Sequence, residues 1–207
     1  TEENEWLSRY RTAIVESGSK AKAIILSIEQ LAAKCTQLIN MDFEFLYDKS
    51  QHLLTIGYNT DEHRRDNSFY DLLASEIRLT TFSAISEGKL PQQSWFALGR
   101  QLTNIGSTPV LLSWSGSMFE YLMPLLVMPG YKNTLLDQTT KAVIQRQMEY
   151  GKKRAVPWGI SESGYNMVDA HLNYQYHPFG VPGLGFKRGL GEDLVVSPYS
   201  TVMALMV

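Results

Sequence analysis

Carboxylates in aromatic, hydroxyl-rich surroundings are the side chains of this chain that are best suited to chemistry. The stretch from Trp158 to Asn166 holds Glu162 together with two glycines, two serines and a tyrosine, and it has neither helical nor strand periodicity. Aromatic rings stack on sugars, and paired acids cleave glycosidic bonds. The stretch therefore predicts a sugar-binding loop whose acid is Glu162. The alternative is a surface turn with a solvated glutamate, because loops are normally polar and exposed.

A second acid, Glu76, falls on the apolar face of a predicted helix. The pattern predicts that this helix runs over residues 68–87 and begins with a capping box at residues 68–71. Burying a bare carboxylate is costly, so Glu76 must be hydrogen-bonded, paired or functional. It is therefore either a catalytic acid or a structural partner of Arg78 or Arg100.

A third acid, Glu120, stands close to the start of another predicted helix. The small-residue bend Ser113–Ser117 leads into a helix from Met118, which Pro124 should end early. An acid in the first turn interacts favourably with the positive end of the helix dipole. Glu120 is therefore either a reserve catalytic acid or only a helix-start acid, and the pattern leaves both open.

Motifs for cofactors, metals and nucleic acids do not fit this sequence. The four histidines and the single cysteine, Cys35, lack zinc-like spacing, and the glycines at 183–189 miss the dinucleotide fingerprint. Residues 159–163 lack the last glycine of a serine-nucleophile elbow. The net charge of −2 does not suggest nucleic acid as a partner. We therefore expect no cofactor, no metal and no nucleic-acid partner.

The elements that must position the three acids are mostly helical. Hydrophobic residues make up 44% of the chain and charged residues 19%, as in a globular domain rather than a disordered one. Alternating apolar residues predict one β-hairpin over 43–58. The further expected helices are 2–15 and 21–39 (separated by a break at Ser17–Ser19, with Cys35 buried), 68–87, 91–98, 118–123, 134–150 (capped by Thr134, with Met148 on the core side, closed by Gly151) and 198–207. Loops are expected at 59–67, 103–108 and 180–191.

This layout predicts a mostly α protein and is compatible with a helical toroid in which loops at one end build a cleft. No run of about 18 apolar residues is present that could span a bilayer. The chain stops at Val207 within an apolar predicted helix, which indicates a fragment of a longer polypeptide.

Several long motifs resemble the glucoamylase-like middle domain of cyclic β-1,2-glucan synthases. They are residues 42–48 (DFEFLYD) with 56–58 (IGY), 68–78 (SFYDLLASEIR), 113–121, 158–166 and, most specifically, 174–193 (YQYHPFGVPGLGFKRGLGED). The resemblance covers residues 42–207, which would be the N-terminal portion of such a domain, truncated at its C-terminal side. Residues 1–41 would form a helical lead-in.

The resemblance implies about half of an (α/α)6 toroid with a short β-hairpin insertion. It implies a β-1,2-glucan chain as substrate and the remaining domains of a larger membrane-bound synthase as partners, with this domain on the cytoplasmic side of the inner membrane. Family members use the domain to close linear chains into rings by transglycosylation. An endo-β-1,2-glucanase and a non-catalytic glucan-binding module are the alternatives.

Carried over by position, Glu162 and Glu76 match the two acids that the family uses for chemistry, and Glu120 is the reserve. We expect Glu162 to be the nucleophile, kept ionised by nearby hydroxyls and amides, and Glu76 to be the acid/base of a retaining reaction. Substrate contacts are expected from Asp71, Asp48, Trp114, Tyr121, Trp158, Tyr165 and Asn166.

Overall fold

A computed structural model describes residues 2–207, except for the side chains of Tyr165 and Asn166. The chain divides into two compact units, Thr1–Asp42 and Phe43–Val207.

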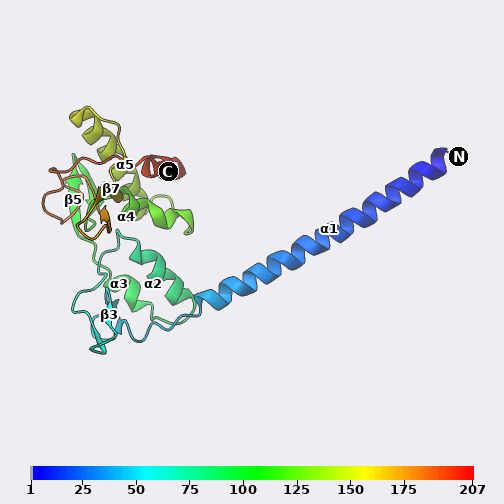
Figure 1. Ribbon diagram of the computed structural model, residues 1–207, viewed down its shortest axis with the longest axis horizontal. Coiled ribbons are helices and arrows are strands. Elements are labelled where there is room, and N and C mark those ends of the chain that lie inside the picture. The colour runs from blue at the N-terminus through cyan, green and yellow to red at the C-terminus, as the bar shows by residue number, and fades with distance from the viewer. Residues whose placement is uncertain (1) are drawn as a thin grey trace. The chain divides into compact units, whose positions relative to one another are not determined.

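The first unit is one long helix, α1 (Glu2–Ile39), which Figure 1 shows without a break. The predicted interruption at Ser17–Ser19 is wrong, because helix-forming residues on both sides offset the cost of Gly18, about 1 kcal/mol. The helix has no buried residue, so the expected burial of Cys35 and its apolar stripe is also wrong. Helical periodicity marks an apolar face, but it does not supply the partner that covers it.

The second unit begins with two short hairpins. Strand β1 (Tyr47–Asp48) pairs with β2 (Leu53–Leu54), which confirms the hairpin expected in this region. Strand β3 (Tyr58–Asn59) pairs with β4 (Arg64–Arg65), so the loop expected at 59–67 is in fact a second hairpin.

Helix α2 (Ile77–Ser86) begins later than its apolar pattern predicts. The capping box at residues 68–71 does not form, because this segment pairs with other backbone: Phe69 bridges to Thr55, and Leu72 bridges to Gly99. Glu76 is therefore the N-cap residue of α2 and does not lie on a buried helix face. Helix α3 (Gln93–Ala97) confirms the short helix expected at 91–98.

A third hairpin, β5 (Leu102–Ile105) with β6 (Thr108–Leu111), replaces the loop expected at 103–108. Helix α4 (Met118–Leu122) follows and continues as the 3-10 helix η1 (Met123–Leu126), so Pro124 ends the α-helix early as expected.

Helix α5 (Leu135–Arg154) has the expected N-cap, since the Thr134 side chain accepts a hydrogen bond from the Asp137 N–H. The helix passes Gly151 and is closed instead by Ala155 in the left-handed conformation. Gly151 is needed for packing: a Cβ there would lie 2.9 Å from the Cβ of Trp158. Met148, expected on the core side, is exposed.

The fourth hairpin joins β7 (Ser163–Val168) to β8 (Tyr174–His177). The chain then runs through a glycine-rich loop to α6 (Pro198–Met203) and the 3-10 helix η2 (Ala204–Met206). Gly180 and Gly185 let this loop lie against the backbone of residues 115–116, since a Cβ at Gly180 would meet the Ser115 carbonyl oxygen at 1.8 Å.

One hydrophobic core joins these elements. Its most buried members come from β6, α4, α5, the segment before β7 and the glycine-rich loop; they are Val110, Leu111, Met118, Leu122, Val143, Ile160, Val181 and Leu184. Over residues 2–207, helices alternate with four two-stranded antiparallel sheets. This is compatible with a mostly α chain, with more β-hairpins than the one expected. No helix over the same residues is long and apolar enough to cross a membrane.

Candidate active site

Helix α5 fixes the position of the segment that carries Glu162. Gln147 is fully buried in α5, and its side-chain amide makes two hydrogen bonds to the backbone of Ile160. The Ile160 N–H donates to Oε1 at 2.8 Å, and Nε2 donates to the Ile160 carbonyl at 2.9 Å. The backbone two residues before Glu162 therefore has a defined position.

A hydroxyl chain ties the same segment to two other helices. The Phe119 N–H of α4 donates to Ser161 Oγ at 2.9 Å, and Ser161 Oγ lies 2.9 Å from the Tyr199 hydroxyl of α6. The Tyr199 hydroxyl donates to the Glu162 carbonyl at 2.9 Å. Burial raises the pKa of Tyr199. The sequence showed Tyr199 only as a residue of the last helix, because its contact with Glu162 depends on how α6 packs.

The carboxylate of Glu162 is half-buried and accepts a hydrogen bond from the Tyr176 hydroxyl of β8. Burial raises the pKa of Glu162, and the negative charges of Glu76 and Glu120 raise it further, whereas the hydroxyls of Tyr176 and Ser117 act to lower it. The hydroxyl effect expected from the sequence is thus present, but burial and the two neighbouring acids outweigh it.

Glu76 lies at the start of α2 and accepts a hydrogen bond from Ser75 Oγ at 2.8 Å. Arg78, only 3% exposed, joins this region to α4 by donating to the carbonyls of Ser75 at 3.1 Å, Glu120 at 3.0 Å and Tyr121 at 2.6 Å. Burial lowers the pKa of Arg78 to about 10, and the charge of Glu76 opposes that effect. Arg78 therefore fixes the two acid-bearing segments to one another.

Glu120 is only 4% exposed, and the bend at 113–117 wraps around its carboxylate. Three serine hydroxyls and three backbone N–H groups donate to it; they belong to Ser113, Trp114, Ser115 and Ser117. Ser117 and Glu120 also form a reciprocal capping box at the start of α4. The lone pairs of Glu120 are occupied by its own loop, which is the structural role that the sequence left open.

The structure joins the segments of all three predicted acids, because Arg78 bonds the start of α2 to the Glu120 carbonyl and the Phe119 N–H of α4 donates to Ser161, the residue before Glu162. It also brings together two predicted substrate-binding residues, since Trp114 Nε1 donates to Asp71 Oδ1 at 3.2 Å. The Trp114 ring is 49% exposed and packs against Phe186, with 5.7 Å between ring centroids. This pair offers an exposed aromatic surface next to an acid.

Tyr121 is a core residue, so its expected role as a stacking platform is wrong. Its side chain is 2% exposed, and its hydroxyl donates to the carbonyls of Leu111 at 2.9 Å and Leu184 at 2.8 Å. Burial raises the pKa of Tyr121 strongly. A ring that is buried on both faces cannot stack on a sugar.

The remaining predicted residues have more local roles or lie outside the described set. Asp48 closes the β1–β2 turn by accepting hydrogen bonds from the Ser50 and Gln51 N–H groups, and hydrogen bonding, chiefly from the Ser50 side chain, lowers its pKa. Trp158 is half-buried against the core, and its carbonyl accepts from Thr201 Oγ1 at 3.1 Å. The side chains of Tyr165 and Asn166 lie outside the described residues.

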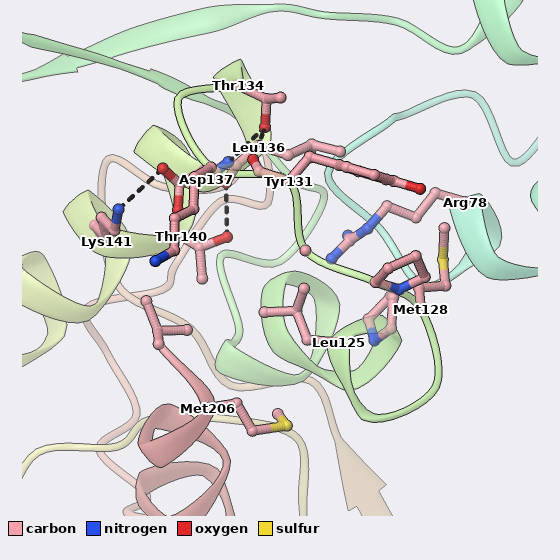
Figure 2. Close-up of a pocket in the computed structure, with 15 residues that line it drawn as sticks. Arg78, Leu125, Met128, Tyr131, Thr134, Leu136, Asp137, Thr140, Lys141 and Met206 are labelled. Carbon is pink, nitrogen blue, oxygen red and sulfur yellow. Dashed lines mark hydrogen bonds and ion pairs between the residues drawn. The ribbon is translucent and has the colours of Figure 1, made fainter.

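A cavity of about 290 Å³ lies apart from the three acids, between η1, the start of α5 and the end of the chain. Figure 2 shows the ion pair of Asp137 and Lys141 (2.9 Å) on one side of this cavity and Arg78 on another. Arg78 is thus the residue that borders both the cavity and the acid-bearing segments. In the part of the chain that the structure describes, no group of three or more His, Cys, Asp or Glu residues is arranged to hold a metal ion.

The sequence of this chain is similar to one protein family and to one characterised synthase. The model of the Glycoamylase family, described as "Putative glucoamylase", matches residues 68–207. This chain belongs to that family. It is also 50% identical over 167 residues to the cyclic beta-(1,2)-glucan synthase NdvB of Rhizobium meliloti (strain 1021). These findings confirm the resemblance drawn from the sequence motifs.

The alignment with NdvB covers 81% of this chain but only 6% of NdvB. The chain therefore corresponds to a small part of that large synthase. Membership of the Glycoamylase family and the similarity to NdvB support a carbohydrate-active, glucan-related role for the chain.

Proposed function

We propose that this chain carries the acid pair of a glycoside-active domain that acts on β-1,2-glucan. The reaction is retaining transglycosylation, which closes a linear chain into a ring within a larger membrane-bound synthase. One observation carries the proposal: Glu162 is a half-buried carboxylate whose segment is bonded to α4 through Ser161, and Arg78 bonds the start of α2, where Glu76 lies, to the same helix. A half-buried acid whose segment is joined to a second acid-bearing segment is typical of a catalytic site. The similarity to NdvB supports β-1,2-glucan as the substrate.

In the first step, a carboxylate oxygen of Glu162 attacks the anomeric carbon of a glucose unit. The bond between that carbon and the glycosidic oxygen breaks, and Glu76 in its acid form gives its proton to the departing oxygen. The products are a glycosyl ester on Glu162, the released 2-hydroxyl of the leaving fragment and an ionised Glu76.

In the second step, the 2-hydroxyl at the far end of the same chain enters the site. Glu76 takes its proton while the hydroxyl oxygen attacks the anomeric carbon, and the ester bond to Glu162 breaks. Both carboxyl groups return to their starting states. Two displacements leave the anomeric configuration unchanged, as the exchange of one β-1,2 bond for another requires. Water in place of the hydroxyl would give hydrolysis, so exclusion of water decides the outcome.

Glu120 and Arg78 support the reacting acids in this proposal and do not touch the sugar. Glu120 is already hydrogen-bonded by its loop, and Arg78 holds the Glu76 region against α4. Trp114, with its exposed ring, is the stacking surface, and Asp71 fixes the indole through Nε1. As part of the same proposal, this chain forms about half of an (α/α)6 toroid. The completed domain associates with the other domains of the synthase.

Separate Glu76→Gln and Glu162→Gln variants of a polypeptide that holds the complete domain test this function. Each variant should lose about 10²–10⁴-fold in the rate of conversion of linear β-1,2-glucan. Glu87→Gln is the matched control, because Glu87 is an exposed acid at the opposite end of α2. Ring products support cyclisation, and linear products alone indicate an endo-glucanase. Full activity in either acid variant contradicts the proposal.

A further inference from the structure

We propose that Tyr176 is a positioning residue of this site, which orients the Glu162 carboxylate and favours its ionised form through a hydrogen bond from its hydroxyl. The hydroxyl of Tyr176 donates to Glu162 Oε2. The role of Tyr176 in catalysis rests on the proposed function. The effect of its hydrogen bond on Glu162 can be tested without measuring activity. Tyr176 is not among the site residues predicted from the sequence.

The register of the β7–β8 hairpin explains why these two side chains meet. Ser163 is opposite His177, and Gly164 is opposite Tyr176. Glu162 directly precedes β7, so it stands two positions from Gly164, on the side of the hairpin that Tyr176 shares. Side chains in this diagonal relation lie within reach of one another when one is aromatic or long.

Gly164 keeps the space between Glu162 and the aromatic side chains of β8 open. A Cβ at this position would lie 1.5 Å from the hydroxyl of Tyr174, so any side chain would displace that ring. Tyr174 and Tyr176 are two residues apart on one strand and therefore point to the same side. With Tyr174 over Gly164, the next ring along the strand, Tyr176, is the one that reaches Glu162.

The groups that face Glu162 come from α2, α4 and β8 and act in opposite directions. Glu76 at the start of α2 and Glu120 in α4 contribute negative charge, which disfavours ionisation of Glu162. Tyr176 of β8 donates its hydroxyl hydrogen to Glu162 and so stabilises the ionised form, whereas the nearby hydroxyl of Ser117, the N-cap of α4, donates to Glu120. Tyr176 acts on the carboxylate itself, and burial and the neighbouring carboxylate raise its own pKa, so it remains a donor. A nucleophilic carboxylate between two other acids needs such a donor.

Tyr199 provides an unusually close comparison for Tyr176. Both tyrosines donate a hydroxyl hydrogen bond to Glu162, but Tyr199 donates to the backbone carbonyl, whereas Tyr176 donates to the carboxylate. Replacement of either tyrosine by phenylalanine removes one hydroxyl and keeps the ring. Only the Tyr176 variant removes a bond that favours the ionised carboxylate.

The experiment is a pH titration of the 207-residue chain carrying ¹³C-labelled glutamate, with Glu162→Gln used to assign the Glu162 carboxyl signal. Tyr176→Phe should raise the midpoint of the Glu162 titration by about 0.5–1 pH unit, since hydrogen bonds to charged groups are moderately strong even where solvent screens them. Tyr199→Phe should leave the midpoint within about 0.2 pH unit of the parent. Amide spectra of both variants verify that each is folded.

An unchanged midpoint in Tyr176→Phe, or equal shifts in the two variants, overturns the proposal. In an active polypeptide with the complete domain, Tyr176→Phe should move the acidic limb of the kcat/KM profile to higher pH by the same amount. If Glu162→Gln is fully active, the proposed function fails, yet the titration still decides whether Tyr176 controls the ionisation of Glu162. The two failures are therefore distinguishable.

Discussion

The bend at Ser113–Ser117 and the segment at 160–164 both hold a glutamate close to the start of α4, but they surround it differently. The bend gives Glu120 six hydrogen-bond donors and leaves it 4% exposed. The 160–164 segment fixes only the backbone of Glu162, through Gln147 and Tyr199, and leaves its carboxylate half-buried with the Tyr176 hydroxyl as its partner.

This comparison separates an acid that builds the fold from an acid that is free for chemistry. The acceptor positions of the Glu120 carboxylate are already occupied by donors of the 113–117 bend, so none is available to a substrate. The backbone around Glu162 is fixed by hydrogen bonds, whereas its carboxylate accepts a hydrogen bond from one tyrosine. A nucleophile requires this combination of a fixed position and an accessible carboxylate. Burial and neighbouring acids are common to Glu120 and Glu162. The number of hydrogen bonds to each carboxylate is what distinguishes the structural acid from the candidate catalytic acid.

The largest expected effect on stability is at Glu120. Glu120→Ala should lower the free energy of unfolding by about 3–5 kcal/mol, because it leaves several buried donors of the 113–117 bend without an acceptor. The matched variant Glu162→Ala should change it by no more than about 1 kcal/mol, since one exposed tyrosine donor is released. Urea denaturation of both variants measures the difference. Equal losses would remove the distinction between the two acids.

The support beneath Glu162 gives the next largest effect. Gln147→Leu should cost about 2–3 kcal/mol, because the buried N–H and carbonyl of Ile160 lose their partners while the volume of the side chain is nearly kept. Gln145→Leu is the control, since Gln145 lies on the same helix with its amide bonded to Glu149 at the surface. Denaturant midpoints with unchanged slopes provide the comparison. A neutral Gln147→Leu would mean that α5 does not hold the segment.

The aromatic surface at Trp114 should affect binding more than folding. Trp114→Ala removes the exposed ring next to Phe186 and Asp71, and should weaken glucan binding by about 1–2 kcal/mol, or roughly 5–30-fold in Kd. Phe96, a more exposed aromatic ring on α3, gives the control Phe96→Ala, which should leave Kd unchanged. Calorimetry with linear β-1,2-glucan measures both. Weakening of the same size in both variants would argue against a dedicated stacking surface.

The smallest expected effect is a pH dependence of stability that comes from Glu162. Because burial and like charges raise the pKa of Glu162 in the folded state, the folded chain binds more protons than the unfolded chain above the ordinary glutamate value. Stability is therefore lost as pH rises from about 4.5 through the folded pKa. Glu162→Gln should abolish that loss, so the variant gains stability relative to the parent as pH rises. A difference that does not change with pH would contradict the raised pKa.

Local pattern was sufficient to predict some parts of this molecule. Thr134 was recognised as a helix N-cap, Pro124 as a helix terminator and residues 43–58 as a hairpin, because each depends on neighbours in sequence. The three acids were selected because each had an unusual place in a pattern, and hydrogen bonds from Arg78 and Phe119 join their segments in the structure.

Features that depend on distant backbone could not be predicted in the same way. The late start of α2 results from the bridges of Phe69 to Thr55 and of Leu72 to Gly99, and the hairpin β5–β6 has strands too short to show a period. Tyr121 differs from an exposed tyrosine only because two carbonyls from distant segments accept its hydroxyl. Tyr176 and Tyr199 reach Glu162 only through strand register and helix packing.

The central claim is that Glu162 is the nucleophile and Glu76 the acid/base, and rescue of the alanine variants by azide tests it most directly. The substrate is a β-linked glucan donor with an aryl leaving group, in a polypeptide that holds the complete domain. Azide that replaces the Glu162 carboxylate attacks from the α face, so Glu162→Ala should yield an α-glycosyl azide. In Glu76→Ala, azide attacks the ester on Glu162 from the β face and should yield a β-glycosyl azide. The opposite pair of products, or an α-azide from neither variant, would contradict the assignment.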